Sequence, residues 1–154
     1  MAGHQGQSGS AEHVAARRRF FTPAEADRAL VLVKRIVADI TRDYAQLSDL
    51  QESMDTAHQT GMYDRAEHQR DRIVEAVERI QAFAKELNDL GAELEDWTLG
   101  VVGFPCMAGG REVVLCWQAD DHAVEYWHDV DEECGHRRPI HTLPMSPAPA
   151  WQTA

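Results

Sequence analysis

The chain has 154 residues and a formal net charge of -11, with 44% hydrophobic and 27% charged residues. This length and composition are typical of one globular domain with its own core, and no stretch of 18 apolar residues is present to predict a membrane-spanning helix. The acidic balance argues against a nucleic-acid-binding protein, because contacts to a phosphate backbone depend on Lys and Arg.

In chain order, residues 1–18 are polar and Gly-rich, which predicts a disordered N-terminal tail. Residues 19–141 are predicted to form a single domain, divided into a helical hairpin over 22–91 and a β module over 92–141. Residues 142–154 are rich in Pro and Ala, which predicts a loose tail. The N-terminus has no apolar segment before a cleavage site, so we expect no signal peptide and a cytoplasmic location.

The first helix has a clear start signal. Thr22 can cap it, Pro23 suits its first position, and Glu25 can reach back to complete a capping box. We expect this helix to run to about Thr56, followed by a turn over 58–62. The second helix is expected from near Tyr63 to Gly91, since Gly favours the left-handed conformation that ends helices.

Two heptad strings mirror each other about residue 60, with apolar residues three and four apart. This symmetry predicts an antiparallel hairpin in which Val33 meets Leu87, Tyr44 meets Ala76, and Gln51 lies opposite Gln69. The strings are Leu30, Val33, Val37, Ile40, Tyr44, Leu47, Gln51 and Met54, and then Ala66, Gln69, Ile73, Ala76, Ile80, Phe83, Leu87 and Leu90.

After Gly91 the pattern predicts three strands, at 97–104, 111–117 and 123–128, with a loop at 106–110 and a turn at 118–121. The middle strand is apolar on both faces, so we expect it to be central in its sheet or covered on both sides. The predicted fold class is therefore α+β: a long antiparallel two-helix coiled-coil hairpin with a small antiparallel β-sheet docked at its base.

An ordered set of sequence words carries a family resemblance: Phe20-Phe21-Thr22-Pro23-x-Glu25-Ala26, Asp96, Gly103-Phe104-Pro105, Gly110-Arg111-x-Val113-x-Leu115-Cys116-Trp117, Tyr126-Trp127-His128 and Arg137-Arg138-Pro139-Ile140. The set resembles an uncharacterised bacterial family, domain of unknown function 2203, over about residues 19–141. The resemblance implies a small bacterial intracellular protein and no particular activity. Gly103 stands where this family usually has Asp, and Glu133, Cys134 and His136 stand where it usually reads Gly, Phe and Gly. Our candidate functional residues are Arg111, Cys116, Trp117, Trp127, His128 and Arg137.

The C-terminal part holds donors suited to zinc or iron. The predicted metal ligands are His128, Cys134 and His136, with His141 and neighbouring acids as further donors. A joint site of Cys116 and His128 is the less favoured alternative. An even-length hairpin loop puts these two residues on opposite faces of the sheet, and only a three-residue loop or a bulge would bring them together.

Other clusters favour structural roles. Asp55, His58, Asp64 and His68 at the hairpin tip are expected to form exposed ion pairs, and a metal site between the helices is the less favoured alternative. Cys106 and His128 could serve nucleophilic catalysis, but nothing places them within reach of each other, so we assign no catalytic residues and do not expect an enzyme. Three cysteines at these spacings predict no disulfide framework, and reduced thiols are expected.

The leading functional hypothesis is a non-enzymatic binding or adaptor protein that acts through protein–protein contacts, including self-association as a homodimer. It rests on apolar residues outside the heptad strings, namely Leu32, Ile36, Leu50 and Val74. The alternative is a metal-binding protein with zinc or iron in the β module. No other cofactor, no nucleic acid and no membrane partner is predicted.

Overall fold

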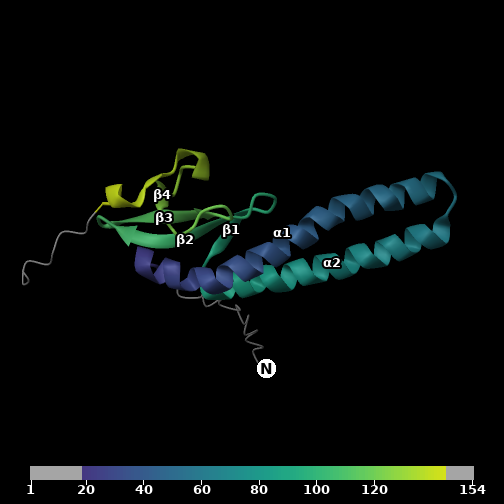
Figure 1. Cartoon of the computed structure of the whole chain (residues 1–154), viewed down its shortest axis with the longest axis horizontal. Coiled ribbons are helices and arrows are strands. Elements are labelled where there is room, and N and C mark those ends of the chain that lie inside the picture. The colour runs from purple at the N-terminus through teal and green to yellow at the C-terminus, as the bar shows by residue number, and fades with distance from the viewer. Residues whose placement is uncertain (1–18, 145–154) are drawn as a thin grey trace, which may run out of the picture.

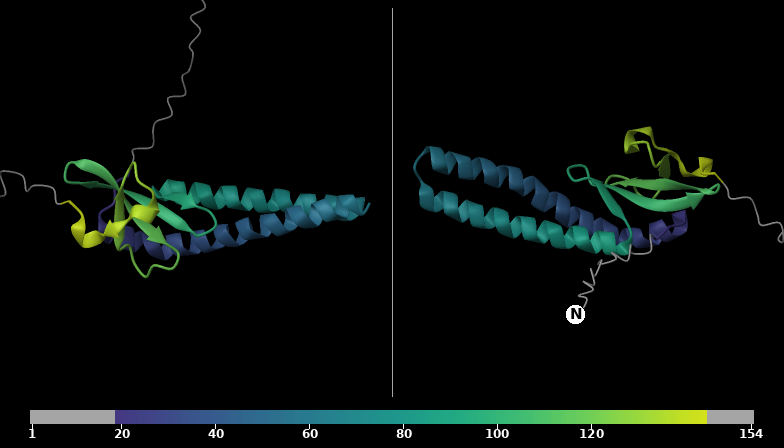
Figure 2. Two further views of the ribbon diagram at one scale, coloured as in Figure 1. Left: turned by 90° about the horizontal axis from the view of Figure 1, so that it is seen from above. Right: turned by 180° about the vertical axis from the view of Figure 1, so that it is seen from behind.

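The computed structural model describes residues 19–144, in which a long helical hairpin is followed by a five-stranded antiparallel sheet (Figure 1). The predicted α+β class is confirmed. The hairpin packs against the sheet at one end, and its other end projects beyond it (Figure 2). The predicted tail at 1–18, and the tail at 142–154 from residue 145 on, lie outside the described residues. No helix in the described part is long and apolar enough to cross a membrane.

Helix α1 (Pro23–Gln59) begins as its sequence predicts. The Thr22 hydroxyl accepts a hydrogen bond from the Glu25 backbone nitrogen at 3.2 Å, and the Glu25 carboxylate accepts one from the Thr22 nitrogen at 3.2 Å. Helix α2 (Tyr63–Leu90) ends at Gly91, whose φ is 94°. These reciprocal bonds and the left-handed glycine satisfy backbone groups that a helix leaves unpaired at its ends.

The buried face of α1 follows the predicted string near the sheet and departs from it farther out. Leu30, Val33, Val37 and Ile40 are buried as predicted, and Val33 and Leu87 both have 0% exposure. From residue 43 outward, the buried positions become Asp43, Leu50 and Ala57. Tyr44 is 42% exposed, and Gln51 is also exposed. The buried face has therefore rotated by one residue relative to the predicted heptad.

Two polar contacts show the actual pairing in the outer half. Arg79 donates to the Asp43 carboxylate at 3.2 Å, and the Gln69 side chain donates to the Ser53 hydroxyl at 2.9 Å. The predicted Gln51–Gln69 layer is thus wrong. Tyr44 instead lies with its ring centroid 6.0 Å from that of Trp97, so a residue of the β module occupies the place expected for α2.

The sheet has the order β1 (Glu93–Asp96), β2 (Val101–Ala108), β3 (Arg111–Gln118), β4 (Tyr126–Asp129) and β5 (Arg138–Pro139). The prediction that β3 is central is confirmed. The strand predicted at 97–104 is confirmed over 101–104, which belong to β2, and is wrong over 97–100, which form a turn between β1 and β2. The predicted loop at 106–110 is also too long, since β2 and β3 pair up to a two-residue turn at Gly109–Gly110, where φ is 60° and 78°.

One face of the sheet forms the core with the hairpin. Strand residues with side chains on this face, among them Phe104, Leu115 and Trp117, join the same buried cluster as Phe21 and Val33. The Phe21 nitrogen donates to the Pro105 carbonyl at 2.7 Å, and the rings of Phe21 and Phe104 meet edge to face at 5.2 Å. The hairpin therefore covers this face, and residues of the opposite face are available for a site.

Candidate metal site on the outer face of the sheet

Cys116 and His128 lie on the same outer face, which corrects the predicted separation. Cys116 pairs with Tyr126 and His128 pairs with Val114, and directly paired residues of neighbouring strands point to one face. The connection between β3 and β4 spans seven residues, 119–125, and β4 starts at residue 126 rather than 123. This odd length reverses the parity assumed for a short turn, so the two side chains come together.

Glu95 reaches the same place from β1 through a β-bulge. Leu94 pairs with Val102 and Asp96 pairs with Val101, so Glu95 is the extra residue between them. A bulge commonly redirects a side chain beside a functional site. Glu95 lies over Gly103, where an added Cβ would be 2.5 Å from Glu95 Oε1. The missing side chain at Gly103 therefore leaves the room that the carboxylate occupies.

Cys134 completes the group from the segment between β4 and β5. It begins a short 3-10 helix, Cys134–His136. Ion pairs hold both sides of this segment, with Arg137 on Asp121 and Arg138 on Glu132, the latter at 2.7 Å. The Arg137 guanidinium also lies 4.0 Å from the centroid of the Tyr126 ring. These contacts fix the position of Cys134 over the outer face of the sheet.

His128 is 2% exposed, and its two ring nitrogens have different environments. Nδ1 lies 2.7 Å from the Asp129 carbonyl oxygen, which can only accept, so Nδ1 carries a hydrogen. Nε2 has no hydrogen-bond partner among the described residues and lies 3.7 Å from Glu95 Oε2. Glu95 raises the pKa of His128 above its ordinary value, burial opposes this rise, and the Asp129 carbonyl adds to it.

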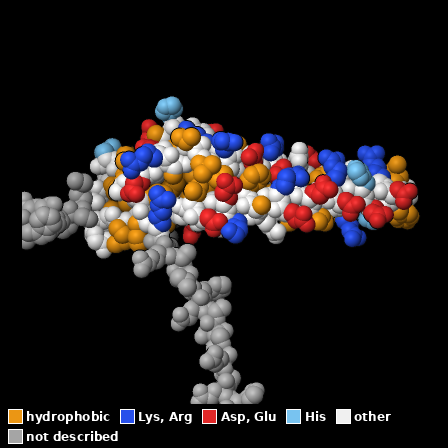
Figure 3. Space-filling view, turned by 90° about the horizontal axis from the view of Figure 1, so that it is seen from below, with side chains coloured by type: hydrophobic (Ala, Val, Ile, Leu, Met, Phe, Trp, Pro, Cys, Tyr) orange, Lys and Arg blue, Asp and Glu red, His pale blue; other side chains and the backbone are white. Residues whose placement is uncertain are grey.

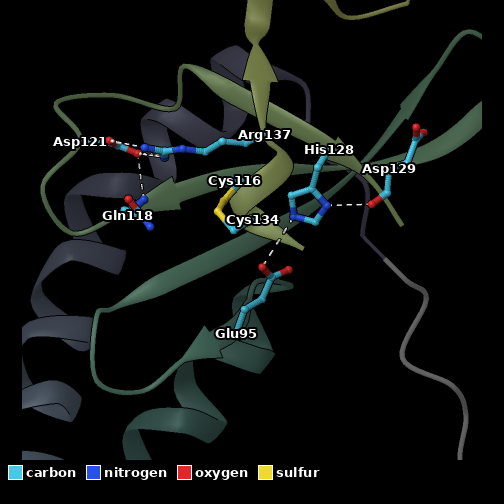
Figure 4. The surroundings of a disulfide bond; sticks show 8 residues. All are labelled: Glu95, Cys116, Gln118, Asp121, His128, Asp129, Cys134 and Arg137. Atoms are coloured by element: carbon cyan, nitrogen blue, oxygen red, sulfur yellow. Dashed lines mark hydrogen bonds and ion pairs between the residues drawn. A yellow bond between two sulfur atoms is a disulfide. The ribbon is translucent and has the colours of Figure 1, made fainter. Parts of the chain in front are cut away.

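Four potential ligand atoms converge here, from Glu95, Cys116, His128 and Cys134, and all lie within 4.8 Å of one another (Figure 4). Cys116 and Cys134 form a disulfide, with their Cα atoms 6.3 Å apart. The expectation of reduced thiols is wrong for this pair in this structure, because folding brings residues 18 positions apart together. Cys106 remains a free, buried thiol whose pKa is raised by burial.

A cavity of about 650 Å³ adjoins the group. Glu95, His128 and Cys134 form part of its wall, together with Glu93 and Glu133. Cys116, which has 0% exposure, lies behind this wall. Three of the four donor residues therefore border a space large enough for a small molecule.

The other candidate functional residues serve the structure of the β module. Arg111 contacts Asp129 at 2.9 Å. The Trp117 indole donates to the Asp121 carbonyl at 3.0 Å and the Trp127 indole to the Thr142 hydroxyl at 2.9 Å. Both tryptophans belong to the core shared with the hairpin, on the face opposite His128. None of these side chains supplies a donor to the group.

Of the predicted metal ligands, the structure brings together His128 and Cys134 but not His136. His136 and His141 are exposed and lie outside the group, as do the histidines of the hairpin tip. Cys106 lies on the core face with Phe104, so the sheet separates it from His128. Glu95 is not among the predicted ligands. It joins the group because of the β-bulge, which the sequence of residues 93–96 does not reveal.

Comparisons with known proteins identify the family alone. A family model described as "Uncharacterized conserved protein (DUF2203)" matches residues 19–140. No curated protein and no solved structure matches the chain. The matched range includes every residue of the four-donor group.

Proposed function

The chain belongs to the uncharacterised family DUF2203, whose description names no activity, and from its four-donor group we propose that it binds a transition metal, with zinc the best fit. The reduced Cys116 and Cys134, together with His128, supply the principal ligands. Glu95 stands at the fourth position.

The observation that carries this proposal is the unpartnered Nε2 of His128. A neutral imidazole with its Nδ1 hydrogen on a carbonyl has a lone pair on Nε2, and here that lone pair faces two sulfur atoms and a carboxylate. No donor among the described residues satisfies it. A carbonyl acceptor at the other ring nitrogen is the usual support of a metal-binding histidine, because it fixes the tautomer and the orientation of the ring.

The chemistry of the donors favours zinc over harder cations. Thiolates are soft ligands that prefer zinc, copper(I) and iron–sulfur centres, whereas calcium and magnesium take oxygen ligands. Two thiolates would neutralise a divalent ion, which favours its partial burial between the outer face of the sheet and the segment that carries Cys134. A set of two cysteines and one histidine also occurs in zinc centres that keep a further position for water or substrate.

The disulfide and the metal-bound form exclude each other, since a metal binds thiolates and a disulfide has none. Two electrons and two protons separate the dithiol from the disulfide. The proposal therefore predicts metal binding by the reduced chain and its loss on oxidation.

The test is elemental analysis of untagged protein purified anaerobically with a non-chelating reductant. We expect one zinc per chain, which falls below one tenth after oxidation to the disulfide or after substitution Cys134→Ser. His136→Ala is the matched control, because His136 is a nearby exposed donor outside the group, and it should retain full zinc. Zinc and iron both far below stoichiometry in the reduced wild-type protein would reject the proposal.

The adaptor hypothesis remains a prediction with less support. Of the four apolar residues on which it rested, Ile36 and Leu50 are 3% and 7% exposed and belong to the interior, while Leu32 and Val74 are 39% and 48% exposed. The face of the projecting hairpin seen in Figure 3 carries acidic and basic side chains, with separate hydrophobic side chains between them. This face of the projecting hairpin therefore offers no continuous apolar surface for a homodimer.

A further inference from the structure

We propose that the metal centre keeps one coordination position for an exogenous ligand, and that the adjoining cavity binds a small molecule carrying a positive charge and a metal-binding donor. This inference rests on the proposed metal function and concerns what the same site accepts. An aminothiol, with an ammonium group near a thiol, is the simplest compound of this class.

Three of the four donors are held firmly. Cys116 has 0% exposure and His128 has 2%, and both lie on paired strands of the sheet. Cys134 lies on a segment fixed by the ion pairs of Arg137 and Arg138. These three residues make a centre of two thiolates and one imidazole, which leaves one position of a tetrahedral zinc ion to be filled.

Glu95 differs from the other donors in a way that makes it replaceable. Its side chain is 31% exposed, and it lies on a bulged strand at the wall of the cavity. A carboxylate oxygen is also a weaker zinc ligand than a thiolate, because zinc prefers softer donors. A thiol or amine that enters the cavity can therefore take the position that Glu95 would otherwise occupy.

The cavity has the right size and charge for a small cation. Its volume of about 650 Å³ lies within the usual range for small-molecule sites. Its walls include Glu93, Asp96, Glu132 and Glu133, and no Lys or Arg is among the residues that line it. Glu132 is paired with Arg138, whereas Glu93 and Glu133 have no ion pair within the described part of the chain. The unpaired carboxylates attract a cation and repel an anion.

The buried histidine distinguishes this cavity from an ordinary acidic surface. His128 is almost completely buried, it lies in the wall of the cavity, and its Nε2 has no hydrogen-bond partner among the described residues. An acidic patch alone gives a diffuse attraction for cations. Here the acidic residues surround the proposed metal centre, where a ligand atom can bind to the metal directly.

The experiment uses the full chain loaded with cobalt(II), whose visible absorption reports its ligands. Uptake of one cobalt per chain is measured first, and it tests the metal site itself. The loaded protein is then titrated with three thiols of similar size: cysteamine, which is cationic, 2-mercaptoethanol, which is neutral, and 3-mercaptopropionate, which is anionic. Retention of cobalt after desalting shows that the thiols bind without removing the metal.

We expect each thiol that binds to change the sulfur-to-cobalt band, and cysteamine to bind about tenfold more tightly than 3-mercaptopropionate. Glu133→Gln should reduce this preference several-fold with cobalt content unchanged. Glu125→Gln, an exposed glutamate outside the cavity, should leave it unaltered.

Three other outcomes would each contradict one or both of the proposals. A cobalt spectrum that no thiol changes means that Glu95 closes the centre, and it overturns this inference while the metal function stands. Equal affinity for the three thiols overturns the cationic class of ligand. Failure to take up cobalt under reducing conditions rejects both proposals together.

Discussion

At the scale of single residues, the four-donor group depends on the absence of a side chain at Gly103. Gly103 pairs with Cys116 on β3 and with Glu93 on β1, so it lies at the centre of the outer face. Any Cβ there would meet both Glu95 Oε1 at 2.5 Å and the Val114 side chain at 2.8 Å. Gly103 is extended rather than left-handed, so close approach, and not a positive φ, is the reason for glycine at this position.

Gly103→Ala is expected to weaken zinc binding roughly tenfold, because Gly103 lies against the ligand Glu95 and changes to residues that support a metal ligand commonly cost this much. Competition with a chromophoric chelator measures the affinity. Gly135→Ala is the matched control, since an added Cβ there meets nothing within 4 Å even though the residue adjoins Cys134. In a Glu95→Ala background the Gly103 substitution should cost little further affinity. An undiminished loss there would assign the effect to Val114 instead.

At the scale of elements, the ends of the hairpin fix where the β module begins. Gly91 ends α2 with φ of 94°, and a Cβ there would lie 3.0 Å from the Arg19 Cβ and 3.3 Å from the Phe21 ring. Gly61, in the turn between the helices, also has positive φ, at 72°, but has open space around it. Substitution of Gly61 therefore introduces backbone strain alone, whereas substitution of Gly91 introduces both backbone strain and steric crowding.

Gly61→Ala is expected to lower the free energy of unfolding by about 1 kcal/mol, the cost of left-handed backbone for an L-residue. Gly91→Ala should lower it by about 1–3 kcal/mol more, because the new methyl group also crowds the packed Phe21. Urea unfolding followed by circular dichroism measures both changes. Equal losses for the two variants would show that the contact with Arg19 and Phe21 relaxes without cost.

The sequence predicts elements best where the signal is local. The capping box at Thr22 and the left-handed Gly91 depend on neighbours within four residues, and both helix ends follow from them. The predicted register of the outer hairpin is wrong because the Tyr44 ring packs beside Trp97, a residue that is remote in the sequence. The site was only half predicted for the same reason. His128 and Cys134 are recognisable metal donors, but the length of the connection before β4 decides whether Cys116 joins them, and the bulge decides the place of Glu95.

At the scale of the whole molecule, zinc is expected to stabilise the reduced chain. A ligand that binds only the folded state adds about 2.7 kcal/mol at a free concentration one hundred times its Kd. The Tm of the reduced protein should therefore rise with zinc and return to its starting value with a chelator. The oxidised protein, in which Cys116 and Cys134 are joined, should not respond. A zinc response in the oxidised protein, or in reduced Cys134→Ser, would place the stabilising metal elsewhere.

The route from α2 to β1 has a mechanical consequence. Glu95 follows Gly91 by four residues and belongs to the first strand after the hairpin, whereas Cys116, His128 and Cys134 lie on later segments. All four donors nevertheless belong to one sheet module, because β1 pairs with β2. Glu95 is the donor closest along the chain to α2, a helix of 28 residues that is about 42 Å long at 1.5 Å per residue. A ligand that displaced α2 would reach Glu95 before the other donors, and by linkage it would change the affinity for metal by the same factor as metal changes the affinity for that ligand.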